Sequence, residues 1–73
     1  MENKKTVTIK TEYITLGQLL KFLRIVGQGG EEKAYLATHD VLVNGEADNR
    51  RGRKLRPGDT VSLDEGEFEI AGQ

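Results

Sequence analysis

The sequence contains no cysteine and a single histidine, His39, among its 73 residues. Without cysteine the chain can form neither a disulfide framework nor a thiolate metal site. The histidine has no second histidine with which to share a metal, and we expect it at a helix end or on the surface. No serine, histidine and aspartate form a persuasive catalytic arrangement. The sequence therefore predicts a protein that is not an enzyme and that uses no metal or other cofactor.

Long apolar runs are also lacking. No segment is long and apolar enough to span a bilayer, and residues 1–5 lead into alternating residues and not into the apolar core of a signal peptide. These absences predict a cytoplasmic protein that does not contact a membrane.

A chain of 73 residues has room for one small domain, residues 1–73, with one modest core. Few large apolar residues remain to line a deep pocket for a small-molecule substrate, and nothing in the sequence demands more than a monomer. Residues at strand or helix spacing form the predicted core: Val7, Ile9, Leu16, Leu19, Leu20, Leu23, Leu36, Val41, Val43, Leu55, Val61, Leu63, Phe68 and Ile70.

The first half of the chain carries one strand pattern and two helix patterns. Residues 6–10 alternate between β-branched apolar and polar side chains, which is typical of a half-buried strand. Thr15 and Gln18 fit a capping box at the start of a helix. Gly27 is a natural left-handed cap for its end, and a shorter helix is predicted at about residues 31–38. Tyr35, in this second helix, is expected in the core or at its boundary.

Two turns divide the second half of the chain into short strands. The apolar run 41–43 stops at Asn44-Gly45, the strongest short signal for a type I′ hairpin turn. Pro57-Gly58 has the order of a type II turn, and residues 60–63 and 68–70 alternate. The order strand, helix, helix and three to four strands predicts an α+β domain, with two helices packed on a small, mostly antiparallel sheet.

The densest feature of the sequence is the basic segment, residues 50–56. Five of its seven residues are cationic: Arg50, Arg51, Arg53, Lys54 and Arg56. Arginine predominates among them, and its planar guanidinium suits phosphate oxygens. No aromatic residue interrupts the segment, which argues against base stacking on single strands. We expect phosphate contacts to a structured RNA, because an A-form helix exposes its backbone more readily than its base edges.

Charge is unevenly distributed, although the net charge is only −1. The only charged residues after Asp59 are acidic: Asp64, Glu65, Glu67 and Glu69. Lys21 and Arg24, three residues apart, should share a flank of the first helix. With Lys33 they would extend the basic surface if the helices pack beside the basic segment. Gln28, in the glycine-rich connection between the helices, is a further candidate RNA contact.

Two helices followed by Val-x-Val-Asn-Gly and then Pro-Gly-Asp-x-Val resemble the S4 RNA-binding domain, or αL motif. This module occurs in ribosomal protein S4, pseudouridine synthases and tyrosyl-tRNA synthetases. The resemblance covers about residues 15–63 and is strongest, through Gly29-Gly30 and residues 50–55, to short stand-alone bacterial S4-domain proteins of the YaaA type. It implies RNA binding without catalysis, with ribosomal RNA or a ribosomal subunit as the partner.

The chain departs from the family pattern at both helix starts. The family often opens its first helix with Arg-Leu-Asp, where this chain has Thr15-Leu16-Gly17, and its second with Ser-Arg, where this chain has Gln28-Gly29. Two usual RNA-facing arginines are therefore missing. We expect the basic segment to take over their role.

Two other classes of protein fit parts of the sequence. Val-Asn-Gly-Glu followed by Leu-x-x-Gly-Asp-x-Val also occurs in β-grasp sulfur carriers. Those proteins begin with a β-hairpin and need a C-terminal Gly-Gly carboxylate, whereas this chain ends Ala-Gly-Gln. A protein–protein adaptor that uses the acidic segment 64–69 as its contact is the other alternative.

Overall fold

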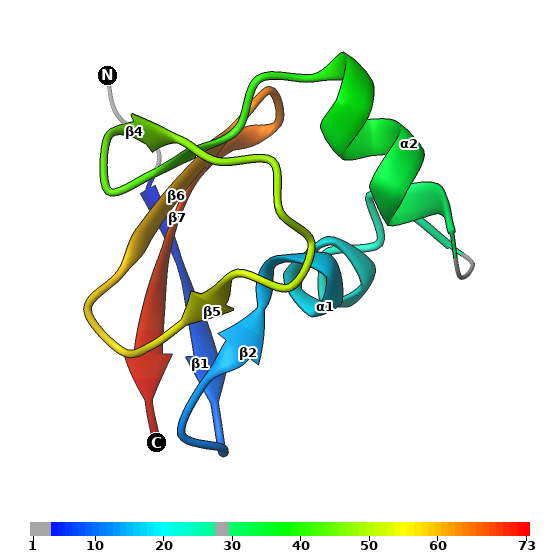
Figure 1. Cartoon of the computed structure of the whole chain (residues 1–73). Helices are drawn as coiled ribbons and strands as arrows, with labels where there is room; N and C mark the ends of the chain where they lie inside the picture. The colour runs from blue at the N-terminus through cyan, green and yellow to red at the C-terminus, as the bar shows by residue number, and fades with distance from the viewer. Residues whose placement is uncertain (1–3, 28–29) are drawn as a thin grey trace.

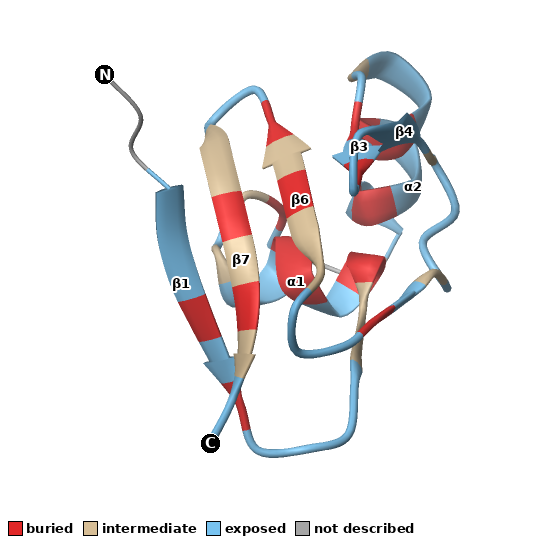
Figure 2. Cartoon of the chain, turned by 90° about the vertical axis from the view of Figure 1, so that its left-hand side faces the viewer, coloured by how far each residue is buried: buried red, intermediate tan, exposed pale blue. Residues whose placement is uncertain are grey.

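The two longest strands come from opposite ends of the chain and lie side by side. In the computed structural model, which describes residues 4–27 and 30–73, β1 (Lys4–Ile9) pairs in parallel with β7 (Gly66–Gly72). The remaining pairs are antiparallel and involve β6 (Thr60–Leu63), β3 (Leu42–Val43) and β4 (Glu46–Ala47). The sheet order is β1-β7-β6-β3-β4 (Figure 1; β3 is labelled in Figure 2).

A second, two-stranded sheet lies beside the first. It joins β2 (Ile14–Thr15) to β5 (Lys54–Leu55) in antiparallel register. The prediction of an α+β fold with a mostly antiparallel sheet is confirmed, and the structure adds this second, two-stranded sheet to it. A two-residue strand is too short to show alternation, so β2 could not be detected from periodicity.

Helix α1 (Leu16–Phe22) begins at the predicted capping box. The Gln18 N–H donates to the Thr15 hydroxyl at 3.2 Å, and the Thr15 N–H donates to the Gln18 side-chain oxygen at 3.0 Å. The two side chains thus satisfy N–H groups that have no partner within the helix. The capping box is confirmed.

The end of α1 differs from the prediction. Arg24, and not Gly27, takes the left-handed conformation, with φ of 61°. The Arg24 N–H donates to the Lys21 carbonyl and the Ile25 N–H to the Leu20 carbonyl, both at 3.0 Å, which is the pattern of a Schellman motif. Arg24 was predicted on a flank of the helix. It lies instead beyond the end of the helix. The motif turns the chain back, so that Val26 enters the core.

Helix α2 (Glu31–Thr38) has the predicted bounds and starts after Gly30, whose φ is 94°. Its buried side carries Tyr35, whose hydroxyl donates to Glu65 at 2.7 Å. Burial, and then this hydrogen bond, raise the pKa of Tyr35. His39 caps the end of the helix and stacks on Tyr35 with ring centroids 4.0 Å apart, so its prediction as a helix-end residue is confirmed.

Both helices lie on the same side of the five-stranded sheet (Figure 1). The hydrophobic core fills the space between the helices and the sheet. Buried and partly exposed residues alternate along β6 and β7 (Figure 2). All predicted core residues are buried except Leu23, which is partly buried against the core. Val26 and Tyr35 complete it. Among the helices in the described part of the chain, none is long and apolar enough to cross a membrane.

Candidate nucleic-acid interface

Backbone hydrogen bonds hold the basic segment against the start of α1. The carbonyls of Arg51 and Arg53 accept the N–H groups of Gly17 at 2.9 Å and Leu16 at 2.8 Å. Within the segment, the Arg53 N–H donates to the Arg50 carbonyl at 3.1 Å. Because α1 would otherwise leave its first N–H groups unpaired, the helix start and the basic segment stabilise each other. The cations therefore project from an anchored backbone.

Gly17 permits this close approach. A Cβ atom at this position would lie 3.3 Å from the Arg51 carbonyl oxygen and 3.4 Å from Cγ of Glu32. The space that a side chain would need is thus occupied by the basic segment on one side and by α2 on the other. Steric crowding therefore explains why this chain has glycine where the family's Arg-Leu-Asp pattern has aspartate.

Two linked turns hold the other end of the basic segment. Asn44 and Gly45 have φ of 54° and 85°, as a type I′ turn requires. Gly58 has φ of 100°, and the Asp59 N–H donates to the Arg56 carbonyl at 2.9 Å, as in a type II turn after Pro57. The Asn44 amide donates to the Asp59 carboxylate at 3.1 Å, which ties the two turns together.

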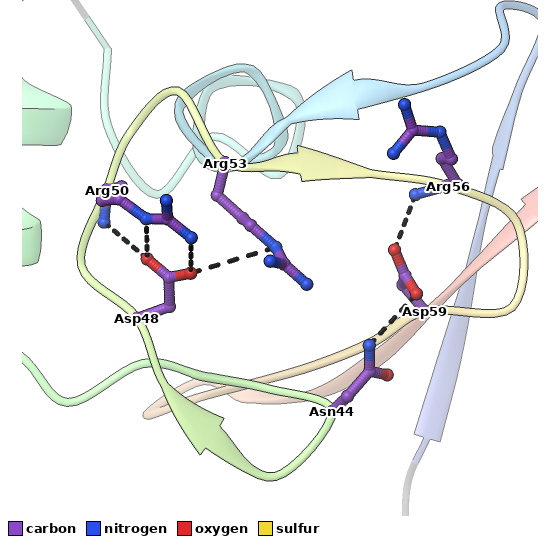
Figure 3. Close-up of polar contacts among 6 residues, drawn as sticks. All are labelled: Asn44, Asp48, Arg50, Arg53, Arg56 and Asp59. Carbon is purple, nitrogen blue, oxygen red and sulfur yellow. Dashed lines mark hydrogen bonds and ion pairs between the residues drawn. The ribbon is translucent and has the colours of Figure 1, made fainter.

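Asp48 binds the first arginine of the segment (Figure 3). Its carboxylate accepts from Nε of Arg50 at 3.1 Å, from Nη2 at 2.9 Å and from the Arg50 backbone N–H at 3.0 Å. Nε of Arg53 lies 3.9 Å from the same carboxylate. The Arg50 hydrogen bonds, reinforced by the charges of Arg50 and Arg53, lower the pKa of Asp48 to about 2. One acid therefore offsets part of the positive charge of the segment.

An open groove runs along the basic segment. Its lining contains four cations and one acid: Arg50, Gly52, Arg53, Lys54, Arg56, Pro57 and Asp59. Burial alone would raise the pKa of Asp59, but hydrogen bonds from the Arg56 backbone N–H and the Asn44 amide lower it. The carboxylate of Asp59 is thus already hydrogen-bonded within the protein. Arg53 and Arg56 project to opposite sides of β5 (Figure 3). Positive charge is thus presented on both sides of the strand.

Lys21 and Arg51 meet at a largely buried carboxylate. Nζ of Lys21 lies 4.0 Å and Nη1 of Arg51 3.8 Å from Oε1 of Glu32. A backbone N–H of Glu32 itself, together with the two cations, lowers the pKa of Glu32 against the opposing effect of burial. The structure therefore brings Lys21 beside the basic segment, through an acid on α2.

The other flanking candidates make no polar bond to the basic segment. Arg24 and Lys33 are both exposed, and neither forms a hydrogen bond or ion pair with residues 50–56 in the described ranges 4–27 and 30–73. Gln28 lies outside the described residues. The predicted continuous basic surface is therefore supported only as far as Lys21.

Tyr13 is the residue that sequence reasoning missed. Its ring lies under Nζ of Lys54, 5.1 Å from the ring centroid, and under the Arg56 guanidinium, at 5.7 Å. These are cation–π distances. The basic segment has no aromatic residue of its own, but the pairing of β2 with β5 supplies one from far upstream. Only the register between these strands could have revealed it.

The fold, the capping box, the Asn-Gly turn and the anchored basic segment define a small α+β domain of the S4 type. The family model for the S4 domain matches residues 7–71, and the chain belongs to this family. The resemblance noted from the sequence is thereby confirmed. The chain is 51% identical over 65 residues to the probable ribosome maturation protein RlbA of Bacillus subtilis (strain 168). The match covers 88% of this chain and 92% of that relative.

Proposed function

We propose that this protein binds structured RNA without catalysing a reaction, and that its target is ribosomal RNA or a ribosomal subunit. One observation carries the proposal: four cations line an open groove along a segment whose backbone is held at both ends. Phosphate contacts of this kind position a protein on a nucleic acid and supply most of its affinity. The name of the Bacillus subtilis relative, a probable ribosome maturation protein, supports a ribosomal target. Such a target would place the protein in the cytoplasm.

The cations have different parts in this proposal. Lys54 and Arg56 line the groove, are exposed and make no hydrogen bond through their charged groups to the rest of the described chain, so they are the primary phosphate contacts. Arg51 is also exposed and adds a further contact, although its guanidinium lies 3.8 Å from Glu32. Arg50 and Arg53 are oriented by Asp48 and contribute from fixed positions. Lys21, which shares Glu32 with Arg51, is a flanking contact to the RNA. Arg24, Lys33 and Gln28 are candidates for RNA contacts farther from the basic segment.

The alternative classes have less support. β1 pairs with β7 and β2 with β5, so the first two strands do not form the hairpin with which a β-grasp carrier begins. An adaptor contact through the acidic segment would compete with internal bonds. Glu65 already accepts the Tyr35 hydroxyl at 2.7 Å, and Asp64 lies 3.9 Å from His39.

Binding to ribosomal RNA fragments and ribosomal subunits across a salt series tests the proposal. The variant Arg51→Gln/Arg56→Gln removes two charges but spares the Asp48 contacts. We expect the dependence of log affinity on log salt to flatten by roughly 1.4 to 1.8, since each lost phosphate contact is worth about 0.7 to 0.9. The matched control, Lys4→Gln/Lys5→Gln, removes two charges from exposed positions on β1 and should leave the slope unchanged.

Equal slopes for the two double variants would mean that binding depends on net charge and not on the basic segment. Absence of any salt-dependent binding by the native protein would refute the RNA proposal. Single variants Lys21→Gln, Arg24→Gln and Lys33→Gln then rank the flanking residues. We expect the largest effect from Lys21.

A further inference from the structure

We propose that Tyr13, together with Lys54 and Arg56, is a stacking site for one unpaired nucleobase beside the phosphate-binding groove. This site rests on the proposed RNA-binding function and extends it. It specifies a structural feature of the target: a paired stem with an unpaired nucleotide next to it. No other described aromatic ring lies within cation–π distance of a lysine or arginine.

The strand register creates the site. Ile14 pairs with Leu55 and Thr15 with Lys54, so continuation of the same register places Tyr13 opposite Arg56. Lys54 and Arg56 are two residues apart, so they project to the same side of β5. Leu55 between them is fully buried, which holds the strand in position. Two cations and one ring therefore share a surface whose geometry is set by the sheet.

Tyr13 is held in place but remains accessible. Its carbonyl accepts the Thr11 hydroxyl at 2.7 Å, which orders the turn between β1 and β2. The residue is nevertheless 37% exposed, although two cationic side chains lie over its ring. An aromatic ring that served only to pack the core would be buried like Tyr35. Tyr13 is instead more than a third exposed and lies beside two of the cations that line the groove.

The chemistry of the three residues matches that of a nucleotide. Aromatic rings and guanidinium planes both stack on bases in RNA recognition, while adjacent cations contact the flanking phosphates. The site accepts any base, because stacking uses the π-face that every base has. Purines should bind better, because their larger ring system gives more stacking area.

Another exposed aromatic residue provides the contrast. Phe22 is 60% exposed at the end of α1, yet no lysine or arginine lies over its ring in the residues that the structure describes. It offers apolar surface without the charge that would hold a phosphate. Phe22 is therefore a control position: an exposed aromatic ring outside the proposed site.

Three synthetic RNA hairpins with the same stem test the proposal. One carries a single bulged adenosine, one an abasic residue at that position, and one is fully paired. We expect the native protein to bind the bulged hairpin roughly five- to a hundredfold more tightly than the other two, the range for stacking of one base. 2-Aminopurine in place of the adenosine should be quenched on binding.

Variants identify the ring as the cause. Tyr13→Phe should keep the preference, while Tyr13→Leu, which retains bulk but has no π-system, should lose it. Both should bind the fully paired hairpin as the native protein does. Phe22→Leu should keep the preference. A variant that retains paired-hairpin binding has kept its fold, so loss of the preference alone is interpretable.

The outcomes separate this proposal from the one on which it rests. Salt-dependent binding of all three hairpins with equal affinity would overturn the stacking site and leave the phosphate groove intact. So would an equal loss by Tyr13→Leu on all three hairpins, because Tyr13 would then serve only to position Lys54 and Arg56. Absence of salt-dependent binding to every hairpin would overturn both proposals.

Discussion

Asp48 controls how much positive charge the basic segment presents. Its carboxylate makes three hydrogen bonds to Arg50 and lies 3.9 Å from Nε of Arg53. Nε of Arg53 is buried and has no hydrogen-bond partner among residues 4–27 and 30–73, so the attraction to Asp48 is what compensates this charge. Asp48 therefore has two opposite effects: it stabilises the fold of the segment, and it weakens the field that attracts RNA.

The variant Asp48→Asn separates these effects. We expect it to destabilise the protein by about 1.5–3 kcal/mol, the range for hydrogen bonds to charged groups, as measured by urea unfolding at pH 7. At the same time it should bind RNA more tightly at low salt, because Arg50 and Arg53 lose a competing negative charge. Asp40→Asn, at an exposed position, makes the same change in charge and should alter stability little.

The pH dependence of stability gives an independent check on Asp48. Its pKa is lowered from 3.8 to about 2 in the folded protein, so its contribution is fully present above pH 3.8 and is lost as the pH falls toward 2. The stability difference between the native protein and Asp48→Asn should therefore shrink across this interval. A difference that stays constant from pH 5 to pH 2 would contradict the ion pair as its source.

At the scale of elements, the basic segment, which includes β5, lies against both β2 and the start of α1. Its carbonyls cap the start of the helix, and its last residues form a strand with β2. A change at the helix start should therefore alter a surface that lies more than thirty positions away in the sequence. Gly17 is one point of close approach between the helix start and the basic segment.

The variant Gly17→Val tests this coupling. Its side chain would press on the Arg51 carbonyl and on Glu32, so we expect a loss of about 1–3 kcal/mol in stability. The displaced segment should also bind RNA less tightly even where the variant is fully folded. Gly52→Ala is the control, because a Cβ atom there meets no atom within 4 Å. If Gly17→Val bound RNA normally, the helix start and the RNA-binding surface would be independent.

At the scale of the whole molecule, positive and acidic turns lie at opposite ends of β6. Pro57 and Gly58 precede this strand, and Asp64 and Glu65 follow it (Figure 1). Six residue steps of extended chain separate Gly58 from Asp64 by roughly 20 Å. This distance exceeds the Debye length of about 8 Å at physiological salt. The acidic end therefore does not cancel the basic end, although the net charge of the chain is close to zero.

Neutralisation at each end should give different salt behaviour. Asp64→Asn/Glu67→Gln is expected to raise RNA affinity at about 0.01 M salt, where the Debye length reaches about 30 Å, and to leave it unchanged at 0.15 M. Glu46→Gln should raise affinity at both concentrations, because Glu46 shares a groove with Arg50 and Arg53. Tighter binding by the first variant at 0.15 M would mean that the RNA reaches the acidic end.

The features that the sequence by itself determined are local ones. The capping box at Thr15, the bounds of α2 and the Asn44-Gly45 turn depend on residues within a few positions of one another. The side chains that meet their hydrogen-bonding and φ requirements are therefore close neighbours in the sequence. The buried residues also followed from periodicity, because each strand or helix shows its apolar side regardless of what covers it. The S4 family likewise could be identified from short motifs.

Only the tertiary structure decided which distant residues meet. The parallel pairing of β1 with β7, the approach of Arg51 to Gly17, and the placement of Tyr13 beside Lys54 join segments that no local pattern relates. Such contacts follow from the register between strands and from the direction in which the chain leaves each element. The Schellman turn at Arg24 sets one of these directions, because it turns the chain three residues before the glycine at which the helix was expected to end. The chemistry of the proposed RNA site depends on these long-range contacts, since they bring the cations, the acid that restrains them and the aromatic ring to one surface.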